Sequence, residues 1–111
     1  MLTLEELAEK YDRHLKHCIE FDVQPGWLQL ANRLLAALVA ADPEIQIYQV
    51  KAKQGLTCYT DSSVELKPHR LTSNAFRESQ HICQWCGEPG ELIGWNVWCP
   101  THAVPANRGV P

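Results

Sequence analysis

The chain lacks an apolar run long enough to cross a membrane, and its N-terminus lacks the basic-then-apolar order of a signal peptide. It also lacks a surplus of basic residues, because 10 Lys and Arg stand against 13 Asp and Glu, for a formal charge of −3. A general nucleic-acid binder needs a basic surface, so this balance weakens that class of function. We expect a cytoplasmic protein that is not associated with a membrane.

The remaining composition is that of an ordinary globular protein, with 111 residues, 45% of them hydrophobic and 21% charged. This length suffices for one domain, or for one domain with a small appendage. Five cysteines without an export signal favour a reducing cytosol. Two of them, Cys18 and Cys58, belong to no motif, and we expect small buried hydrophobic residues here in preference to a disulfide.

Four residues with metal-ligating side chains form two pairs of equal spacing, separated by 12 residues. They are Cys83, Cys86, Cys99 and His102. Zinc prefers four N and S ligands in a tetrahedron, and a two-residue spacer lets a tight turn direct both ligands of a pair toward one ion. Gly87 suits the positive φ of such a turn, and Pro100 fits the first position of a short helix. Because four protein ligands leave no open position, we predict one structural Zn²⁺ ion.

The alternatives for the first ligand pair are a Cys83–Cys86 redox couple and buried free thiols. A redox couple would leave Cys99 and His102, at matching spacing, without a role. Three thiolates and one Zn²⁺ add a net charge of about −1 to the formal charge, so the zinc-loaded protein carries about −4.

The segment between the ligand pairs predicts a short β-hairpin, since two apolar runs flank Gly94 within residues 91–98. A knuckle, a hairpin and a helix that carries the second pair form a treble-clef zinc module. A zinc ribbon would place both pairs on knuckles, and Pro100 favours the treble clef. We therefore assign residues 81–111 to a treble-clef-like or ribbon-like zinc module with a C-terminal tail.

Residues 1–80 predict an α+β core, in which N-terminal helices pack on a small antiparallel β-sheet. We expect helices at about 3–19, 27–41 and 70–80, and a hairpin at about 44–60. Thr3 and Glu6 form a capping box, and the second helix ends before Asp42 because a proline follows it. Along the first predicted strand, the alternation of apolar side chains changes from one face to the other. This predicts either that both faces of the strand are covered or that a bulge lies near residues 47–48. A turn is expected at residues 54–55, and a short third strand at 64–66, ended by a proline.

Three residues on the first predicted helix, His14, His17 and Cys18, lie close enough to bind a second metal ion. No fourth ligand is evident, and histidines on the flank of a helix are common without a metal. Their role is left open.

From residue 26 onward the chain resembles a family of small uncharacterised proteins carried by bacteriophages and prophages. The resemblance is carried by Gly26-Trp27, the Leu-rich helix, Asp42-Pro43-Glu44, residues 49–56, and the two ligand segments, Ile82-Cys83-Gln84-Trp85-Cys86-Gly87-Glu88-Pro89-Gly90 and Trp98-Cys99-Pro100-Thr101-His102-Ala103. It departs at residues 51–55, where the family usually has Lys-Glu-Lys-Phe-Gly-Gly. The resemblance implies a mobile-element origin and zinc, but no activity. Phage genes of this size often encode inhibitors of host machinery or defence, including CRISPR systems, which is an analogy only.

An enzymatic function is disfavoured by the same motif. A catalytic zinc needs an open coordination position, and here the fourth ligand is supplied. Zinc deaminases need His-x-Glu before Pro-Cys-x-x-Cys, an order that is absent. Treble-clef nucleases need a histidine in the hairpin, and none lies between Cys86 and Cys99. We predict that the protein is not an enzyme.

Protein–protein interaction is the function that remains, because tryptophan and arginine are frequent interface anchors. The candidate contact residues are Trp85, Trp95, Trp98 and Arg77. Residues between the first two ligands, Gln84 and Trp85, should point away from the ion, although Trp85 packing back onto the hairpin is the alternative. Nucleic-acid binding is the second hypothesis, through the same tryptophans with Arg70, Arg77 and Arg108. The expected partner is a host protein or complex. Whether the chain also forms a homodimer is left open.

Overall fold

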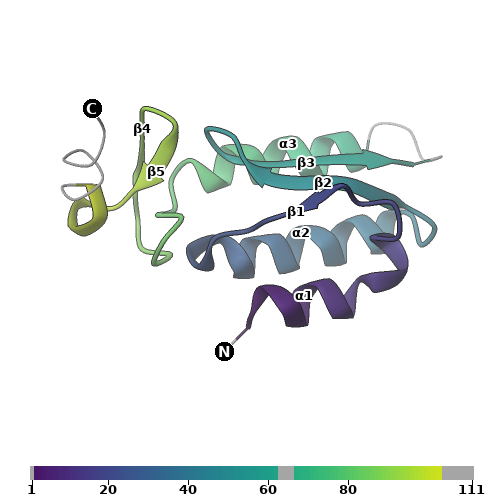
Figure 1. Ribbon diagram of the computed structural model, residues 1–111. Coiled ribbons are helices and arrows are strands. Elements are labelled where there is room, and N and C mark those ends of the chain that lie inside the picture. Colours follow the sequence, from purple (N-terminus) through teal and green to yellow (C-terminus); the bar gives the residue numbers. More distant parts are fainter. Residues whose placement is uncertain (1, 63–66, 104–111) are drawn as a thin grey trace.

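The computed structural model describes residues 2–62 and 67–103 and shows an α+β fold with a small Cys/His module at one end (Figure 1). The third strand predicted at 64–66 and the tail from residue 104 lie outside the described residues. None of the helices in the described part combines the length and apolar character that a membrane span requires.

The hydrophobic core is built around α2 (Leu28–Ala41), which follows a 3₁₀ turn, η2 (Pro25–Trp27). Its leucines recur at helical spacing, so one broad face is apolar and buried. The buried residues of α2 are Leu28, Leu30, Ala31, Leu34, Leu35 and Leu38. Asp42 caps the helix in an extended conformation (φ −148°), as expected for a residue before proline. The predicted helix at 27–41 is confirmed.

The first helix, α1 (Leu4–Lys10), begins with the predicted capping box between Thr3 and Glu6 but is much shorter than the predicted 3–19. After Tyr11 the chain tightens into the 3₁₀ helix η1 (Asp12–His14). The prediction was therefore wrong from residue 11 onward.

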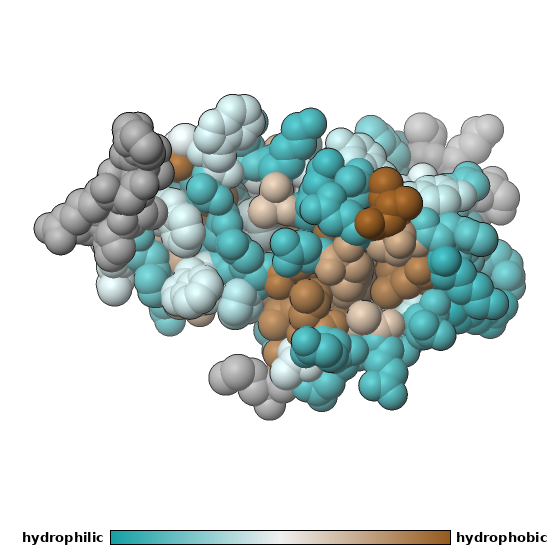
Figure 2. All heavy atoms as spheres, in the orientation of Figure 1, coloured by the Kyte–Doolittle hydropathy of each residue, from teal (hydrophilic) through white to brown (hydrophobic). Residues whose placement is uncertain are grey.

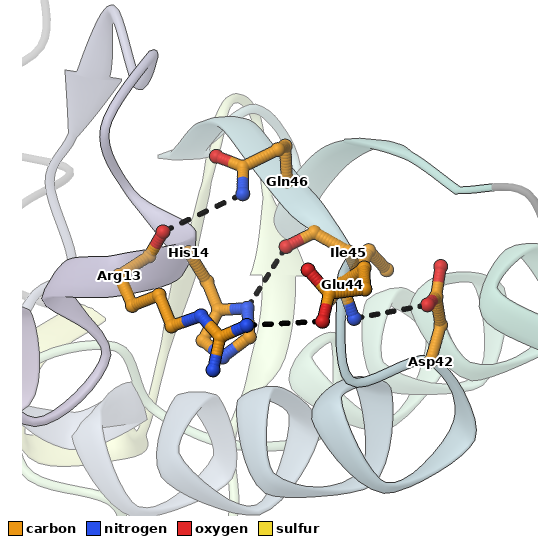
Figure 3. A network of polar contacts seen from close by, with 6 residues as sticks. All are labelled: Arg13, His14, Asp42, Glu44, Ile45 and Gln46. Carbon is orange, nitrogen blue, oxygen red and sulfur yellow. Dashed lines mark hydrogen bonds and ion pairs between the residues drawn. The ribbon is translucent and has the colours of Figure 1, made fainter.

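Tertiary contacts account for this early end. The buried His14 ring approaches the carbonyl oxygen of Ile45 with an Nδ1···O distance of 2.9 Å, and Arg13 forms an ion pair with Glu44 at 2.9 Å (Figure 3). These bonds tie η1 to the start of β2. A helix continued to residue 19 would carry the chain past this strand, so packing overrides local helix propensity.

The sheet has three strands in the order β1-β2-β3. The strands β2 (Gln46–Ala52) and β3 (Leu56–Asp61) form the predicted antiparallel hairpin. The two-residue β1 (Glu20–Phe21) lies parallel to β2, so the sheet is mixed and not purely antiparallel. Two residues are too few to carry a period-2 pattern, which is why β1 escaped prediction.

The predicted bulge is present, because the register of β2 against β3 shifts between Ile47 and Gln49. The extra residue turns both Ile47 and Val50 toward the core, where both are buried. The tight turn falls at the predicted place, with Gln54 at a φ of 60°.

The third helix, α3 (Lys67–Ser79), packs on α2 and β3 and begins three residues before the predicted 70. Pro68 lies in its first turn, where a missing N–H costs nothing. At its C-terminal end Ser79 Oγ accepts a hydrogen bond from the Leu56 N–H at 2.7 Å. Figure 2 shows that apolar atoms also reach the surface over α1, α2 and β1.

Candidate metal centre

The first ligand pair lies on a knuckle formed by residues 83–87. The Gly87 N–H donates to the Cys83 carbonyl at 2.9 Å, and the Cys83 N–H donates to the Glu88 carbonyl at 2.7 Å. Gly87 has a φ of 84°, the left-handed conformation that its position predicted. The knuckle therefore holds Cys83 and Cys86 in one tight turn.

The second ligand pair follows the predicted hairpin of β4 (Glu91–Ile93) and β5 (Asn96–Trp98), whose turn contains Gly94 at a φ of 65°. Residues 100–103 form a helical turn, and the N–H groups of His102 and Ala103 both donate to the Cys99 carbonyl. The order is knuckle, hairpin and helical turn. This is the treble-clef-like arrangement, and a second knuckle of the ribbon type is not formed.

The four side chains meet in one cluster, in which all ligand atoms lie within 4.8 Å of one another. A tetrahedral Zn²⁺ with Zn–S bonds of about 2.3 Å and Zn–N bonds of about 2.0 Å separates two sulfurs by about 3.8 Å, and sulfur from nitrogen by about 3.5 Å. The Cys86 Sγ···Cys99 Sγ distance is 3.6 Å, and His102 Nδ1 lies 3.5 Å from Cys83 Sγ and 3.1 Å from Cys99 Sγ. The donor set and its spacing fit a metal ion of the Zn²⁺ type.

The surroundings of the ligands favour thiolate at Cys83. Burial by itself raises the pKa of this thiol, but the N–H groups of Cys86, Cys99 and Trp85 stabilise its anion and lower the pKa to about 6. Thiolate is the form that binds metal. Cys83 and Cys99 are buried and Cys86 is exposed, so one edge of the centre reaches the surface.

The module is fastened to the core through Gln84, which the sequence predicted to point away from the metal ion. Its side chain does not lie at the surface, since Gln84 is only 1% exposed. Its amide donates to Asn96 Oδ1 at 3.1 Å and also to Gln24 Oε1, and its own oxygen accepts from the Val97 N–H at 2.7 Å. One side chain thus joins the knuckle, the hairpin and the segment before η2.

The backbone before α2 completes this junction. The Gly26 N–H donates to the Gln84 carbonyl at 2.9 Å, and Trp27 Nε1 donates to the Ile82 carbonyl at 2.8 Å. A Cβ on Gly26 would lie 2.0 Å from the Cys83 carbonyl oxygen, so only glycine permits this approach. Sequence reasoning missed the role of Gly26 and Trp27. Gly26-Trp27 entered the sequence analysis only as part of the family resemblance, which gives neither residue a role.

The candidate contact residues occupy different places. Trp85 is 54% exposed, with its ring edge-on to His102 at a centroid distance of 6.4 Å, and Trp95 at the hairpin turn is 71% exposed. Trp98 is half-buried on β5. Arg77 lies on α3, where its guanidinium donates to Asn74. It lines a hollow with β3 residues such as Cys58, and no tryptophan lines that hollow.

The second metal site considered on the first helix is not formed. His14 Nδ1 is hydrogen-bonded to the Ile45 carbonyl oxygen, and α1 ends before His17. Within residues 2–62 and 67–103, the Cys83 cluster is the one group of His, Cys, Asp or Glu side chains arranged to hold a metal ion. The Sγ of Cys18 instead donates to the Glu20 carbonyl at 3.2 Å.

No protein-family model, no curated protein and no solved structure matches this chain. The resemblance to phage and prophage proteins therefore stays a prediction.

Proposed function

We propose that the protein is a non-enzymatic zinc protein that acts by binding another protein through the outer surface of its metal module. The supporting observation is that two tryptophans of the module, Trp85 and Trp95, are more than half exposed. Large exposed aromatic rings on a frame held by a metal and hydrogen bonds are typical of interaction surfaces. A four-ligand centre leaves no coordination position for a substrate, which supports a structural role for the metal.

The proposed partner is a host protein or protein complex in the bacterial cytoplasm, and the proposed effect is inhibition of that machine or defence system, in the manner of anti-CRISPR proteins. This part rests on the resemblance to phage proteins and on the analogy with small phage inhibitors. Nucleic-acid binding is the competing account. Among the described residues of the module no Lys or Arg accompanies the tryptophans, which favours a protein partner.

Capture of partners from a bacterial lysate by the tagged, zinc-loaded chain tests the proposal. Trp85→Ala should retain zinc and thermal stability but weaken capture by about 2 kcal/mol or more, as expected for an interface anchor. Tyr59→Ala is the matched control, because Tyr59 is 48% exposed but lies on β3, outside the metal module.

Loss of stability in Trp85→Ala would assign the ring to the module's own packing and contradict its role as an anchor. Recovery of DNA or RNA, with binding that salt abolishes, would favour the nucleic-acid account.

A further inference from the structure

The two faces of the β4–β5 hairpin are defined by its register, which pairs Glu91 with Trp98 and Leu92 with Val97. On one face Val97 is completely buried against the core, while Leu92 is 41% exposed. We call the other face, with Glu91, Ile93 and Trp98, the outer face, although Asn96 on it bonds to Gln84. Ile93 and Trp98 are half-buried and Glu91 is exposed.

Two adjoining hollows lie beside this outer face. The first, of about 620 Å³, is lined by Ile93 and Trp98 and by Pro89 and Pro100, with Glu91 at its edge. The second, of about 470 Å³, shares both prolines and extends along the metal centre, where Glu88 contributes to its wall. We call the two together the proline groove, defined by Pro89, Ile93, Trp98 and Pro100. Its size and apolar lining suit an inserted side chain or short segment.

The charge at the proline groove has one sign. Residues 81–103 contain Glu88 and Glu91 and no Lys or Arg, and both carboxylates are exposed. Among the described residues, neither of them forms an ion pair. Three thiolates and one Zn²⁺ add one net negative charge, which with the two glutamates makes about three negative charges on this module.

An apolar floor with a negative rim selects a particular kind of partner. The side chains of Arg and Lys have an apolar stem and a cationic end, so the stem suits Ile93 and the prolines while the end reaches the glutamates. The ring face of Trp98 adds attraction for a guanidinium. A phosphate backbone would meet only like charge here.

We propose that the proline groove binds a segment of a partner protein in which arginine or lysine stands next to apolar residues. The inference rests on the proposed function, because it specifies the chemistry of the partner that the metal module would bind. It adds Glu88, Glu91 and Ile93 to the contact surface, beside Trp98.

NMR titration of the full, zinc-loaded chain tests this inference with three probes. They are a short peptide of alternating leucine and arginine, a peptide of alternating leucine and glutamate, and a single-stranded oligothymidine. The leucine–arginine peptide should shift the signals of Glu91, Ile93 and the Trp98 indole, whereas the other two probes should not.

Replacing the rim charges in Glu88→Gln/Glu91→Gln should weaken binding of the arginine peptide by about fivefold, the effect of losing two exposed ion pairs. The matched control is Glu5→Gln/Glu9→Gln on α1, which changes the net charge equally and should leave binding unchanged. Equal binding of the glutamate peptide, shifts caused by the oligonucleotide, or no shift with any probe would each overturn the inference. Capture that depends on Trp85 but is unaffected by the rim variant would uphold the proposed function while this inference fails.

Discussion

At the residue scale, Gly26 is the position where the core and the metal module come closest. Gly26→Ala should cost more than about 3 kcal/mol in unfolding free energy, because the new Cβ would meet the backbone of residues 83–87, which cannot give way as a flexible side chain can. Urea unfolding of the zinc-loaded protein measures this change.

The matched control is Gly94→Ala, at the open hairpin turn. Nothing lies within 4 Å of a Cβ there, so only the left-handed backbone is strained, by about 1–2 kcal/mol. Equal and mild effects of the two substitutions would contradict the close docking of the knuckle on η2.

The cysteines should divide into three classes of reactivity. Burial, with a smaller contribution from Cys18, raises the pKa of Cys58 from 9.0 to about 12, so its thiolate is scarce at pH 8. Burial also raises the pKa of the partly exposed Cys18. With iodoacetamide at pH 8, mass spectrometry should find Cys18 modified slowly, Cys58 unmodified, and the three metal ligands modified only after a chelator is added.

The variant Cys18→Ala/Cys58→Ala should keep its full zinc content and lose about 1–3 kcal/mol of stability through poorer packing. A fall in bound metal would show that these two residues take part in metal binding after all.

The ligands were predictable at this scale because metal geometry imposes a spacing that can be seen in sequence. Gln84 was not predictable. A polar residue between two ligands normally faces water, and its burial depends on Gln24 and Asn96, which are 60 and 12 residues away. Such a satisfied polar junction has no local pattern.

At the scale of the elements, the metal module and α2 should respond to metal removal together. Trp27 is fully buried at the start of α2, and its indole N–H is bonded to the segment that enters the knuckle. Because metal binding and folding are coupled in such modules, chelation or Cys99→Ser should release residues 81–103 and also loosen residues 24–28.

Hydrogen–deuterium exchange resolves this by segment. Amides of residues 81–103 and 24–28 should lose protection, while β2, β3 and the rest of α2 keep theirs, since their core contains no metal ligand. Protection lost across all elements at once, or retained at 24–28, would refute the limited coupling described here.

Elements with strong local patterns were predicted well. The leucines of α2, the alternation of β2 with its slip, and the turns at residues 54–55 and 94 all carry their structure in adjacent residues. The end of α1 and the strand β1 depend on partners across the chain, at Ile45 and Gln49, so local periodicity predicted too long a helix and no strand.

At the scale of the whole molecule, the fold is an apolar α+β core with a metal module fixed at one end (Figure 1). The two parts are stabilised by different interactions. The core is stabilised by its buried leucines, whereas the module buries little besides Val97, Cys83, Gln84 and Cys99. Because its apolar interior is so small, we expect the module to need a metal to stay folded.

The zinc content of the protein tests this account most directly. Native mass spectrometry of the chain, purified without added metal, should give the mass of the polypeptide with one Zn²⁺ and no disulfide. A folded chain without metal, or a Cys83–Cys86 disulfide in freshly prepared protein, would contradict a structural zinc centre at Cys83, Cys86, Cys99 and His102.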